Sequence, residues 1–247
     1  MSELRSKLHW AASGLYFFLV CPFVVVVGVI VGPRRVEGLL TWLCHTSVVL
    51  AGARVRAIVH PDVDPRVPCF FVCNHVNLFD PFVIYPYLPQ VARGIELESH
   101  FRVPVYGWMM KHFGNVPVPD ERTAEGLRRT YRLTKAMLDR GIGLIVFPEA
   151  SRTRDGLVGP FEDGVFRMAH RFGAPIVPVT IEGAFRWCAT GTGRIVPGPV
   201  TVHLHAPVDA RAVPRDGLAA LREQVRATIA GPLGEEIDRD LGNLLKE

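Results

Sequence analysis

The 247-residue chain lacks the short motifs by which several large enzyme classes are identified. It has no Gly-x-Ser-x-Gly elbow, which argues against a serine hydrolase. It has no Gly-x-Gly-x-x-Gly fingerprint and no phosphate-binding loop, so nucleotide redox and kinase chemistry have no support. Internal repeats and low-complexity segments are also missing, and the length suits one core-forming domain with attachments.

The chain has too little excess positive charge for a nucleic-acid-binding protein. Its formal net charge is +4 and its isoelectric point is about 8.9, and its basic residues do not alternate with aromatic ones. We therefore predict no nucleic-acid partner. A mildly basic balance suits an anionic membrane surface or an anionic substrate instead.

Cysteine is sparse, and an odd count of five cannot pair completely. Two lie in apolar N-terminal segments and two in a predicted buried strand, which is typical of reduced core residues in a cytosol-like compartment. Cys69, Cys73 and His75 could be drawn as a metal set, but no second Cys or His pair completes it, so no metal site is predicted. Cys73 as a nucleophile is a weaker alternative, because the sequence around it is apolar.

The chain is rich in apolar sequence near its N-terminus. Residues 10–32 are almost wholly apolar, and about twenty such residues match the thickness of a bilayer core. No small-x-small cleavage site follows, so a retained anchor is favoured over a cleaved signal peptide. Pro22 lies in the middle of the run and is expected to kink it.

A second, weaker apolar segment covers residues 39–52 and is short for a membrane span. Two arrangements remain open: one spanning helix with an interfacial one, or a kinked two-helix hairpin dipping into one leaflet. Basic residues flank the first segment on both sides, at Arg5 and Lys7 and again at Arg34 and Arg35. This symmetry does not choose an orientation, but it mildly favours the hairpin with both ends on the cytoplasmic side.

From residue 54 onward, strand-like and helix-like patterns alternate. Strands are predicted at 54–60, 69–73, 115–118, 144–147, 175–181 and 200–205. Helices are predicted at 81–88, 105–113, 121–140, 161–172 and 216–229. This alternation predicts an α/β fold in which a mostly parallel central sheet is flanked by helices. We predict two parts, membrane-anchoring helices over residues 1–53 and a globular domain over residues 54–247.

The sequence Asn-His-Val-Asn-Leu-Phe-Asp-Pro, residues 74–81, directly follows the apolar strand 69–73. Asp80 before Pro81 predicts a helix start that the carboxylate caps. A turn can also fold Asp80 back onto one imidazole nitrogen of His75, leaving the other nitrogen to act as a base. Alone, Asp80 is more often just a helix cap and His75 just a turn histidine with its hydrogen bonds satisfied. The pair at this spacing, after a buried strand, is what indicates catalysis.

A second polar cluster, Glu149, Ser151 and Arg152, follows the apolar strand 144–147. The carboxyl ends of parallel strands lie at one edge of a sheet, so this cluster and His75 should meet there. Arg152 can grip a phosphate with two hydrogen bonds. Glu149 can orient Arg152 or hold a substrate hydroxyl. A salt-bridged surface turn is the alternative.

A third element, residues 114–122, begins with Gly114, whose missing side chain permits a close backbone approach. Arg122 starts a helix with a basic face, and such a face is most simply a solvated one. Serines are few, and only Ser151 lies near the expected site. A histidine base without a serine partner indicates that the hydroxyl to be activated belongs to the substrate.

Three blocks in this order resemble the glycerolipid acyltransferase family, which includes lysophosphatidic acid acyltransferases. Residues 75–80 resemble its His-x4-Asp motif, and residues 147–152 (Phe-Pro-Glu-Ala-Ser-Arg) resemble its Phe-Pro-Glu-Gly-Thr-Arg motif. Residues 174–179 (Ala-Pro-Ile-Val-Pro-Val) resemble its proline-centred block. The resemblance covers residues 55–205. One block alone would be weak, but the order and spacing of all three are specific.

The resemblance implies acyl transfer from acyl-CoA or acyl carrier protein to a lysophospholipid acceptor in a membrane. The acceptor would be 1-acyl-sn-glycerol 3-phosphate and the product phosphatidic acid, and the reaction would need no cofactor. His75 would take the proton of the acceptor hydroxyl, Asp80 would orient His75, and backbone N–H groups would hold the oxyanion. The catalytic domain would lie on the cytoplasmic face of the membrane. The residues that the resemblance assigns to substrate binding are Gly114, Arg122, Glu149, Ser151 and Arg152.

The chain departs from the family pattern at three places. Asp120 stands where members usually carry an arginine six residues after the glycine of the second block, and Arg122 comes two residues later. Ala150 replaces a glycine, and Glu98 stands where a basic residue is common. A different lyso-lipid acceptor, such as a lyso-aminolipid, therefore stays open, as does a non-catalytic lipid-binding protein on the same fold.

Overall fold

The computed structural model describes residues 3–244, with side chains up to residue 234. The strands are β1 (Ala53–Val59), β2 (Phe70–Cys73), β3 (Ala92–Leu97), β4 (Val116–Val118), β5 (Gly143–Val146), β6 (Ile176–Glu182) and β7 (Gly198–Leu204). The α-helices are α1 (Glu3–Val31), α2 (Glu37–Leu50), α3 (Asp80–Ile84), α4 (Tyr106–Phe113), α5 (Ala124–Asp139), α6 (Gly164–Phe172), α7 (Ala184–Trp187) and α8 (Leu218–Leu244). Short 3-10 turns are η1 (Pro33–Val36), η2 (Tyr85–Tyr87), η3 (Glu98–Arg102) and η4 (Arg215–Gly217).

These strands form a single sheet with the order β1-β7-β6-β2-β5-β3-β4. Every neighbouring pair is parallel except β6 and β7. The prediction of a mostly parallel α/β sheet flanked by helices is confirmed. β2 lies at the centre, paired with β5 on one side and β6 on the other, so the residues that follow it are held at the middle of one sheet edge.

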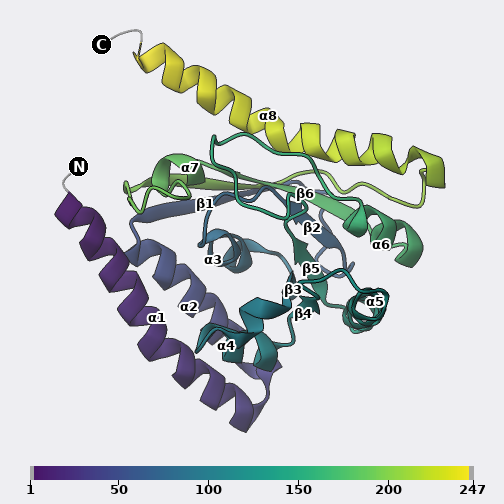
Figure 1. The fold of residues 1–247 in the computed structure, drawn as a ribbon, viewed down its shortest axis with the longest axis horizontal. Coiled ribbons are helices and arrows are strands. Elements are labelled where there is room, and N and C mark those ends of the chain that lie inside the picture. Colours follow the sequence, from purple (N-terminus) through teal and green to yellow (C-terminus); the bar gives the residue numbers. More distant parts are fainter. Residues whose placement is uncertain (1–2, 245–247) are drawn as a thin grey trace.

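Helices cover both faces of the sheet (Figure 1). Phe71 and Cys73 of β2 pack with α1 to α4, whereas Phe70 and Val72 pack with α5, α6 and α8. All four side chains are fully buried. This explains why the sequence of β2 is apolar at every position, since a strand between two helical layers has no solvent face.

The sequence patterns do not predict β3, because Arg93, Gly94 and Glu96 interrupt its apolar residues. Arg93 is nevertheless buried, with 3% of its surface exposed. Its guanidinium pairs with the carboxylate of Glu37 on α2 and donates to the hydroxyl of Tyr85 at 2.9 Å. This buried, hydrogen-bonded ion pair replaces apolar packing and connects α2 to the sheet.

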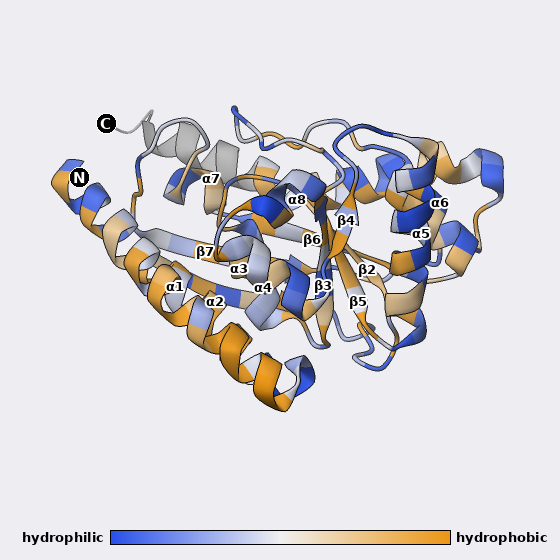
Figure 2. Cartoon of the chain, turned by 60° about the horizontal axis from the view of Figure 1, so that its bottom comes forward, coloured by the Kyte–Doolittle hydropathy of each residue, from blue (hydrophilic) through white to orange (hydrophobic). Residues whose placement is uncertain are grey.

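The two N-terminal apolar segments form α1 and α2, which pack against each other as a hairpin joined by η1 (Figure 1). Helical structure continues on both sides of Pro22. Among residues 3–244, α1 alone is long and apolar enough to cross a membrane. Much of α1 is coloured as hydrophobic in Figure 2, and large apolar side chains on it are exposed, among them Phe18, Phe23 and Ile30. The division between residues 53 and 54 stays a prediction.

Candidate active site

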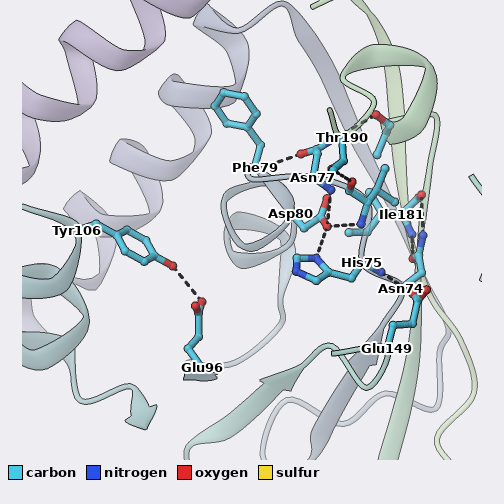
Figure 3. A network of polar contacts seen from close by, with 12 residues as sticks. Asn74, His75, Asn77, Phe79, Asp80, Glu96, Tyr106, Glu149, Ile181 and Thr190 are labelled. Carbon is cyan, nitrogen blue, oxygen red and sulfur yellow. Dashed lines mark hydrogen bonds and ion pairs between the residues drawn. The ribbon is translucent and has the colours of Figure 1, made fainter. Parts of the chain in front are cut away.

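The candidate site lies where β2 and β5 end. The two strands pair in parallel with Val72 opposite Val146, so the residues after them emerge at one edge of the sheet. The backbone N–H of His75 donates to Oε1 of Glu149 at 2.8 Å (Figure 3). The two polar clusters of the sequence therefore meet, as the strand order predicts.

Asp80 reaches back from the start of α3 to the histidine. Nδ1 of His75 lies 2.7 Å from Oδ2 of Asp80, and the same oxygen accepts hydrogen bonds from the backbone N–H groups of Val76 and Asn77. The predicted contact between imidazole and carboxylate is present. The predicted capping role of Asp80 is wrong: Phe79 is the N-cap, and no side chain caps the helix. The carboxylate binds the preceding loop because that loop curls around it.

Two asparagines and a threonine hold this loop in place (Figure 3). Asn74 makes two hydrogen bonds with the backbone of Ile181 on β6, accepting at 2.8 Å and donating at 3.3 Å. Asn77 donates to the carbonyl of Ala184 at 3.2 Å. The hydroxyl of Thr190 donates to a carbonyl of the same loop at 2.7 Å. The histidine is therefore supported by segments more than one hundred residues away in sequence, as a positioned catalytic group requires.

The electrostatic setting of the pair follows from burial. Asp80 is fully buried, and burial raises its pKa, while His75 and the N–H groups of the loop partly lower it. The side chain of His75 is 22% exposed. Its Nδ1 is held by Asp80, and its Nε2 has no hydrogen-bond partner within residues 3–234. One nitrogen is fixed and the other is free to take a proton.

An apolar pocket opens beside the imidazole. The ring of Phe147 stacks on His75 with a centroid separation of 4.4 Å, and it lines this pocket together with residues of α2, α3, β3 and α4. The cavity has a volume of about 50 Å³. In its wall, the hydroxyl of Tyr106 donates to Oε1 of Glu96 at 2.9 Å (Figure 3). The other oxygen of Glu96 contacts His100 at 2.9 Å and raises the pKa of that histidine.

Glu149 binds backbone groups. Its two carboxylate oxygens accept from the N–H groups of His75 and Gly159, each at 2.8 Å. Burial raises the pKa of Glu149, and these two hydrogen bonds partly lower it. Ser151 and Arg152 are exposed. Glu149 makes no hydrogen bond or ion pair with Arg152 within the described residues, because its carboxylate points to the two backbone donors. The alternative role, holding a substrate hydroxyl, stays a prediction.

Ala150 has a backbone φ of +58°, in the left-handed region. This is the position at which the family motif carries glycine. Glycine adopts positive φ freely, whereas a side chain with a Cβ is strained there. The turn after β5 therefore holds Ala150 in a conformation that would suit glycine better.

Gly114 and Arg122 lie farther from the histidine. Gly114 ends α4 with a φ of +80°, and a Cβ there would meet nothing nearer than Cε of Met137 at 3.6 Å. Its left-handed backbone angle requires glycine, and the close backbone approach at Gly114 stays a prediction. Arg122 is 65% exposed and pairs with Glu162 at 3.1 Å. The N–H of Glu162 donates to the carbonyl of Pro148, which connects Arg122 indirectly to the loop after β5.

The sequence patterns do not identify Phe147 as a neighbour of the imidazole, nor Glu96 and Tyr106 as residues of the pocket beside it. Phe147 has one signal, its place at the start of the block 147–152. Glu96 has none, because the strand that carries it is not predicted.

The cysteines offer neither a nucleophile nor a metal site. All five are free and buried. Burial raises the pKa of Cys73 well above the usual value, and its thiol contacts the carbonyl of Phe71. Such a thiol stays protonated and unreactive. No group of three or more His, Cys, Asp or Glu side chains in the described part of the chain is suited to a metal ion.

A histidine–aspartate pair at the carboxyl edge of a parallel sheet, beside an apolar pocket, defines a site for acid–base chemistry on an apolar substrate. A family model described as Acyltransferase matches residues 56–182, more than half of the chain, and includes both polar clusters. The chain belongs to this acyltransferase family.

The chain is similar to known acyltransferases over aligned stretches of different length. The chain is 35% identical over 145 residues to "1-acyl-sn-glycerol-3-phosphate acyltransferase BAT2, chloroplastic" of Brassica napus, covering 57% of this chain and 41% of that protein. It is 23% identical over 245 residues to a 1-acyl-sn-glycerol-3-phosphate acyltransferase of Saccharomyces cerevisiae, covering 95% of this chain and 80% of the relative. The match therefore spans less than half the length of the Brassica protein.

The fold is shared with a solved structure. The crystal structure of the 1-acyl-sn-glycerophosphate (LPA) acyltransferase PlsC from Thermotoga maritima superposes with a TM-score of 0.79. The match has 21% sequence identity and covers 95% of this chain and 97% of the other. At this identity, the likeness establishes the fold.

Proposed function

We propose that the protein transfers a fatty acyl group from a thioester donor to the free hydroxyl of 1-acyl-sn-glycerol 3-phosphate, forming phosphatidic acid. The observation that carries this proposal is the buried carboxylate of Asp80 at 2.7 Å from Nδ1 of His75, with Nε2 free. Family membership and the names of the relatives support it. Acyl-CoA and acyl carrier protein both carry the required thioester, and no cofactor enters the reaction.

In the proposed reaction, His75 acts through Nε2. As the acceptor hydroxyl oxygen attacks the thioester carbonyl, an O–C bond forms and Nε2 takes the hydroxyl proton. The tetrahedral intermediate collapses, the C–S bond breaks, and the leaving thiolate takes the proton from Nε2. Asp80 fixes the tautomer and stabilises the imidazolium. Backbone N–H groups stabilise the oxyanion, and the apolar pocket beside Phe147 accepts the first part of the acyl chain.

We assign the acceptor headgroup to the exposed edge around the loop after β5. Arg152 is exposed there and offers a fork of donors to a phosphate. Arg122 can join it when it leaves its exposed partner Glu162, because exposed ion pairs of this kind are weak. Gly114 and Ser151 complete the proposed set.

A second candidate acceptor carries a positive charge. Asp120 stands where the family usually has an arginine, and its carboxylate accepts from the N–H and the hydroxyl of Ser99. Asp120 also pairs with the exposed Arg102 at 3.5 Å, and when this weak pair opens, the carboxylate suits an amine better than a phosphate. A lyso-aminolipid is therefore the alternative acceptor for the same chemistry.

We place the protein at a membrane through α1, with its catalytic domain on the cytoplasmic face. Large apolar side chains cover the outer face of this helix, and only 17% of its most apolar window is buried. Burying that face in lipid removes a large apolar area from water. Both a spanning helix and a hairpin in one leaflet satisfy this requirement.

The experiment compares the two acceptors directly. Purified protein in phospholipid vesicles receives a long-chain acyl-CoA or acyl carrier protein, together with 1-acylglycerol 3-phosphate or a lyso-aminolipid, and formation of the acylated product is measured. We expect product with the phosphate acceptor. Product with the amine acceptor alone would replace the first candidate by the second. No product with either acceptor or donor would overturn the proposed function.

A further inference from the structure

The N-terminal helix α1 packs on both sides of the turn that carries Asp80. The indole of Trp10 lies against the ring of Phe79 with centroids 5.3 Å apart. One helical face further along, the ring of Phe17 meets that of Phe82 edge to face at 5.5 Å. Phe79 directly precedes Asp80, and Phe82 follows it by two residues. Two aromatic contacts from one helix therefore enclose the start of α3, from which the carboxylate projects.

The contact at Phe79 is buried and is fixed from two sides. Phe79 is 6% exposed and lies between the indoles of Trp10 and Trp187, with the centroids of the second pair 5.1 Å apart. The N–H of Trp10 donates to the carbonyl of Gly193 at 3.0 Å, and that of Trp187 donates to the carbonyl of Ala51 at 2.8 Å. Figure 3 shows Phe79 pointing away from the imidazole toward the N-terminal helices. Rings that are packed and hydrogen-bonded in this way hold a specific geometry.

Polar contacts on either side of Trp10 set its position along α1. Oγ of Ser6 accepts a hydrogen bond from the N–H of Ile195 at 2.8 Å, and the hydroxyl of Ser13 donates to the carbonyl of Ser47 at 2.8 Å. Ser6 and Ser13 are both buried. Sliding or rotating α1 would break these buried hydrogen bonds, which is costly, so the helix holds Trp10 at one place.

Membrane anchoring alone does not explain these contacts. A tryptophan near the end of an apolar helix commonly lies in the membrane–water interface. Trp10, however, is half-buried, and both its ring and its N–H group have protein partners. Other side chains of α1 are free to contact lipid, since Leu15 is 64% exposed and Phe23 is 59% exposed. The helix therefore has one face for the globular domain and another for lipid.

We propose that Trp10 and Phe17 are positioning residues for the catalytic pair. They hold the start of α3 so that Oδ2 of Asp80 stays 2.7 Å from Nδ1 of His75. Accurate placement matters because a displacement of about 1 Å can cost about 10²-fold in rate. Both residues lie outside residues 56–182, which the family model matches. This inference rests on the proposed function and adds two residues of the apolar helix to the support of its base.

The test measures kcat and KM for acyl transfer to 1-acylglycerol 3-phosphate in phospholipid vesicles, with rates expressed per vesicle-bound protein. For Trp10→Ala and Phe17→Ala, we expect kcat to fall at least about tenfold and KM to stay within about twofold, because the base is displaced and the acceptor site is not. Trp10→Phe restores a ring beside its partner and should recover most of the lost kcat. The matched control, Phe23→Ala, truncates an exposed ring of the same helix and should stay within about twofold.

A double-mutant cycle separates positioning from a general loss of stability. If Trp10 acts through the carboxylate, Trp10→Ala should lower kcat by less than about threefold in an Asp80→Asn background, because the contact that it maintains is already lost. Losses that multiply would overturn the proposal, as would a loss accounted for by weaker vesicle binding. An unchanged kcat in folded Trp10→Ala and Phe17→Ala would also overturn it. Should neither alanine variant fold, Phe17→Leu keeps apolar volume without a ring and should still lose at least about threefold.

Nuclear magnetic resonance of protein with isotope-labelled histidine gives a readout that does not depend on turnover. The low-field proton on Nδ1 of His75, assigned by its absence in His75→Gln, reports the hydrogen bond to Asp80. We expect this signal in the wild type and in Phe23→Ala, and its loss in Trp10→Ala. The same signal in all three proteins, or none in the wild type, would overturn the proposal. If the wild type transfers no acyl chain, the proposed function fails and this measurement alone decides the positioning role.

Discussion

His75 and Asp80 are joined by a hydrogen bond of 2.7 Å from Nδ1 to Oδ2, in which the carboxylate is held more firmly than the imidazole. Oδ2 also accepts from two backbone N–H groups of the intervening loop, and the carboxylate is fully buried. Oδ1 has no hydrogen-bond partner within the described residues. Asp80 is thus held in place by the loop, and it orients the imidazole of His75 toward the edge of the pocket.

Replacing Asp80 with asparagine should reduce kcat by about 10³–10⁴-fold with little change in KM. An amide keeps the shape of the carboxylate but does not stabilise an imidazolium, and it can hold the wrong histidine tautomer. Steady-state kinetics with 1-acylglycerol 3-phosphate measure the effect, with the exposed Asp216→Asn as a control. A loss below tenfold would show that the histidine does not depend on this carboxylate.

The pH dependence of stability should reveal Glu149. Burial raises the pKa of Glu149 above its usual 4.5, so the folded protein keeps this proton at pH values where the unfolded chain has lost it. The contribution of Glu149 to the free energy of unfolding therefore falls as pH rises from 4.5 through the raised pKa.

Glu149→Gln removes this titration but loses one accepted hydrogen bond, at a cost of about 1 kcal/mol. The difference in Tm between wild type and variant should be largest at pH 4 and shrink as pH rises. Thermal unfolding monitored by circular dichroism measures it. A difference that widens with pH would contradict the raised pKa.

Ala150→Gly should raise the free energy of unfolding by about 0.5–1 kcal/mol, because glycine relieves the left-handed strain but adds freedom to the unfolded chain. Ala150 is exposed, so no packing is lost. The control is Ala136→Gly, an exposed helical position on α5, where glycine should destabilise by about 1 kcal/mol. Denaturant unfolding measures the free energy of unfolding of both variants. A change of the same sign in the two variants would refute the prediction.

Glu37→Gln should lower the free energy of unfolding by about 3–5 kcal/mol, because it leaves the guanidinium of Arg93 buried without a counter-charge. The side chain of Arg93 is 4% exposed. The double variant Glu37→Met/Arg93→Met should recover much of the loss, since it removes both charges. A double variant that is less stable than Glu37→Gln would contradict this prediction, because the ion pair itself would then provide the stability.

The fold could be predicted where local sequence and tertiary environment agree. β2 and β5 are apolar throughout because both of their faces are buried, and their patterns predict them correctly. β3 could not be predicted, because Arg93 is stabilised by a partner 56 residues earlier in the chain. The short helix α7 likewise has no periodic signal over its four residues.

The candidate site likewise combines a local contact that the sequence predicts with a long-range contact that it does not. The contact between His75 and Asp80 spans five residues and follows from a single turn. The hydrogen bond from the backbone of His75 to Glu149 spans 74 residues, and only the strand order brings the two together. The backbone partners of Glu149 could not be predicted from its sequence neighbours, because they lie on the loop after β2 and at Gly159.

The most direct test of the proposed function is transfer of a labelled acyl chain to 1-acylglycerol 3-phosphate by wild type and His75→Gln, both in phospholipid vesicles. Glutamine can keep a hydrogen bond to Asp80 but cannot act as a base. We predict labelled phosphatidic acid from the wild type and a rate at least about 10³-fold lower from the variant, with both folded to the same extent. Undiminished transfer by His75→Gln would contradict the account, since the proton of the acceptor hydroxyl would then leave by another group.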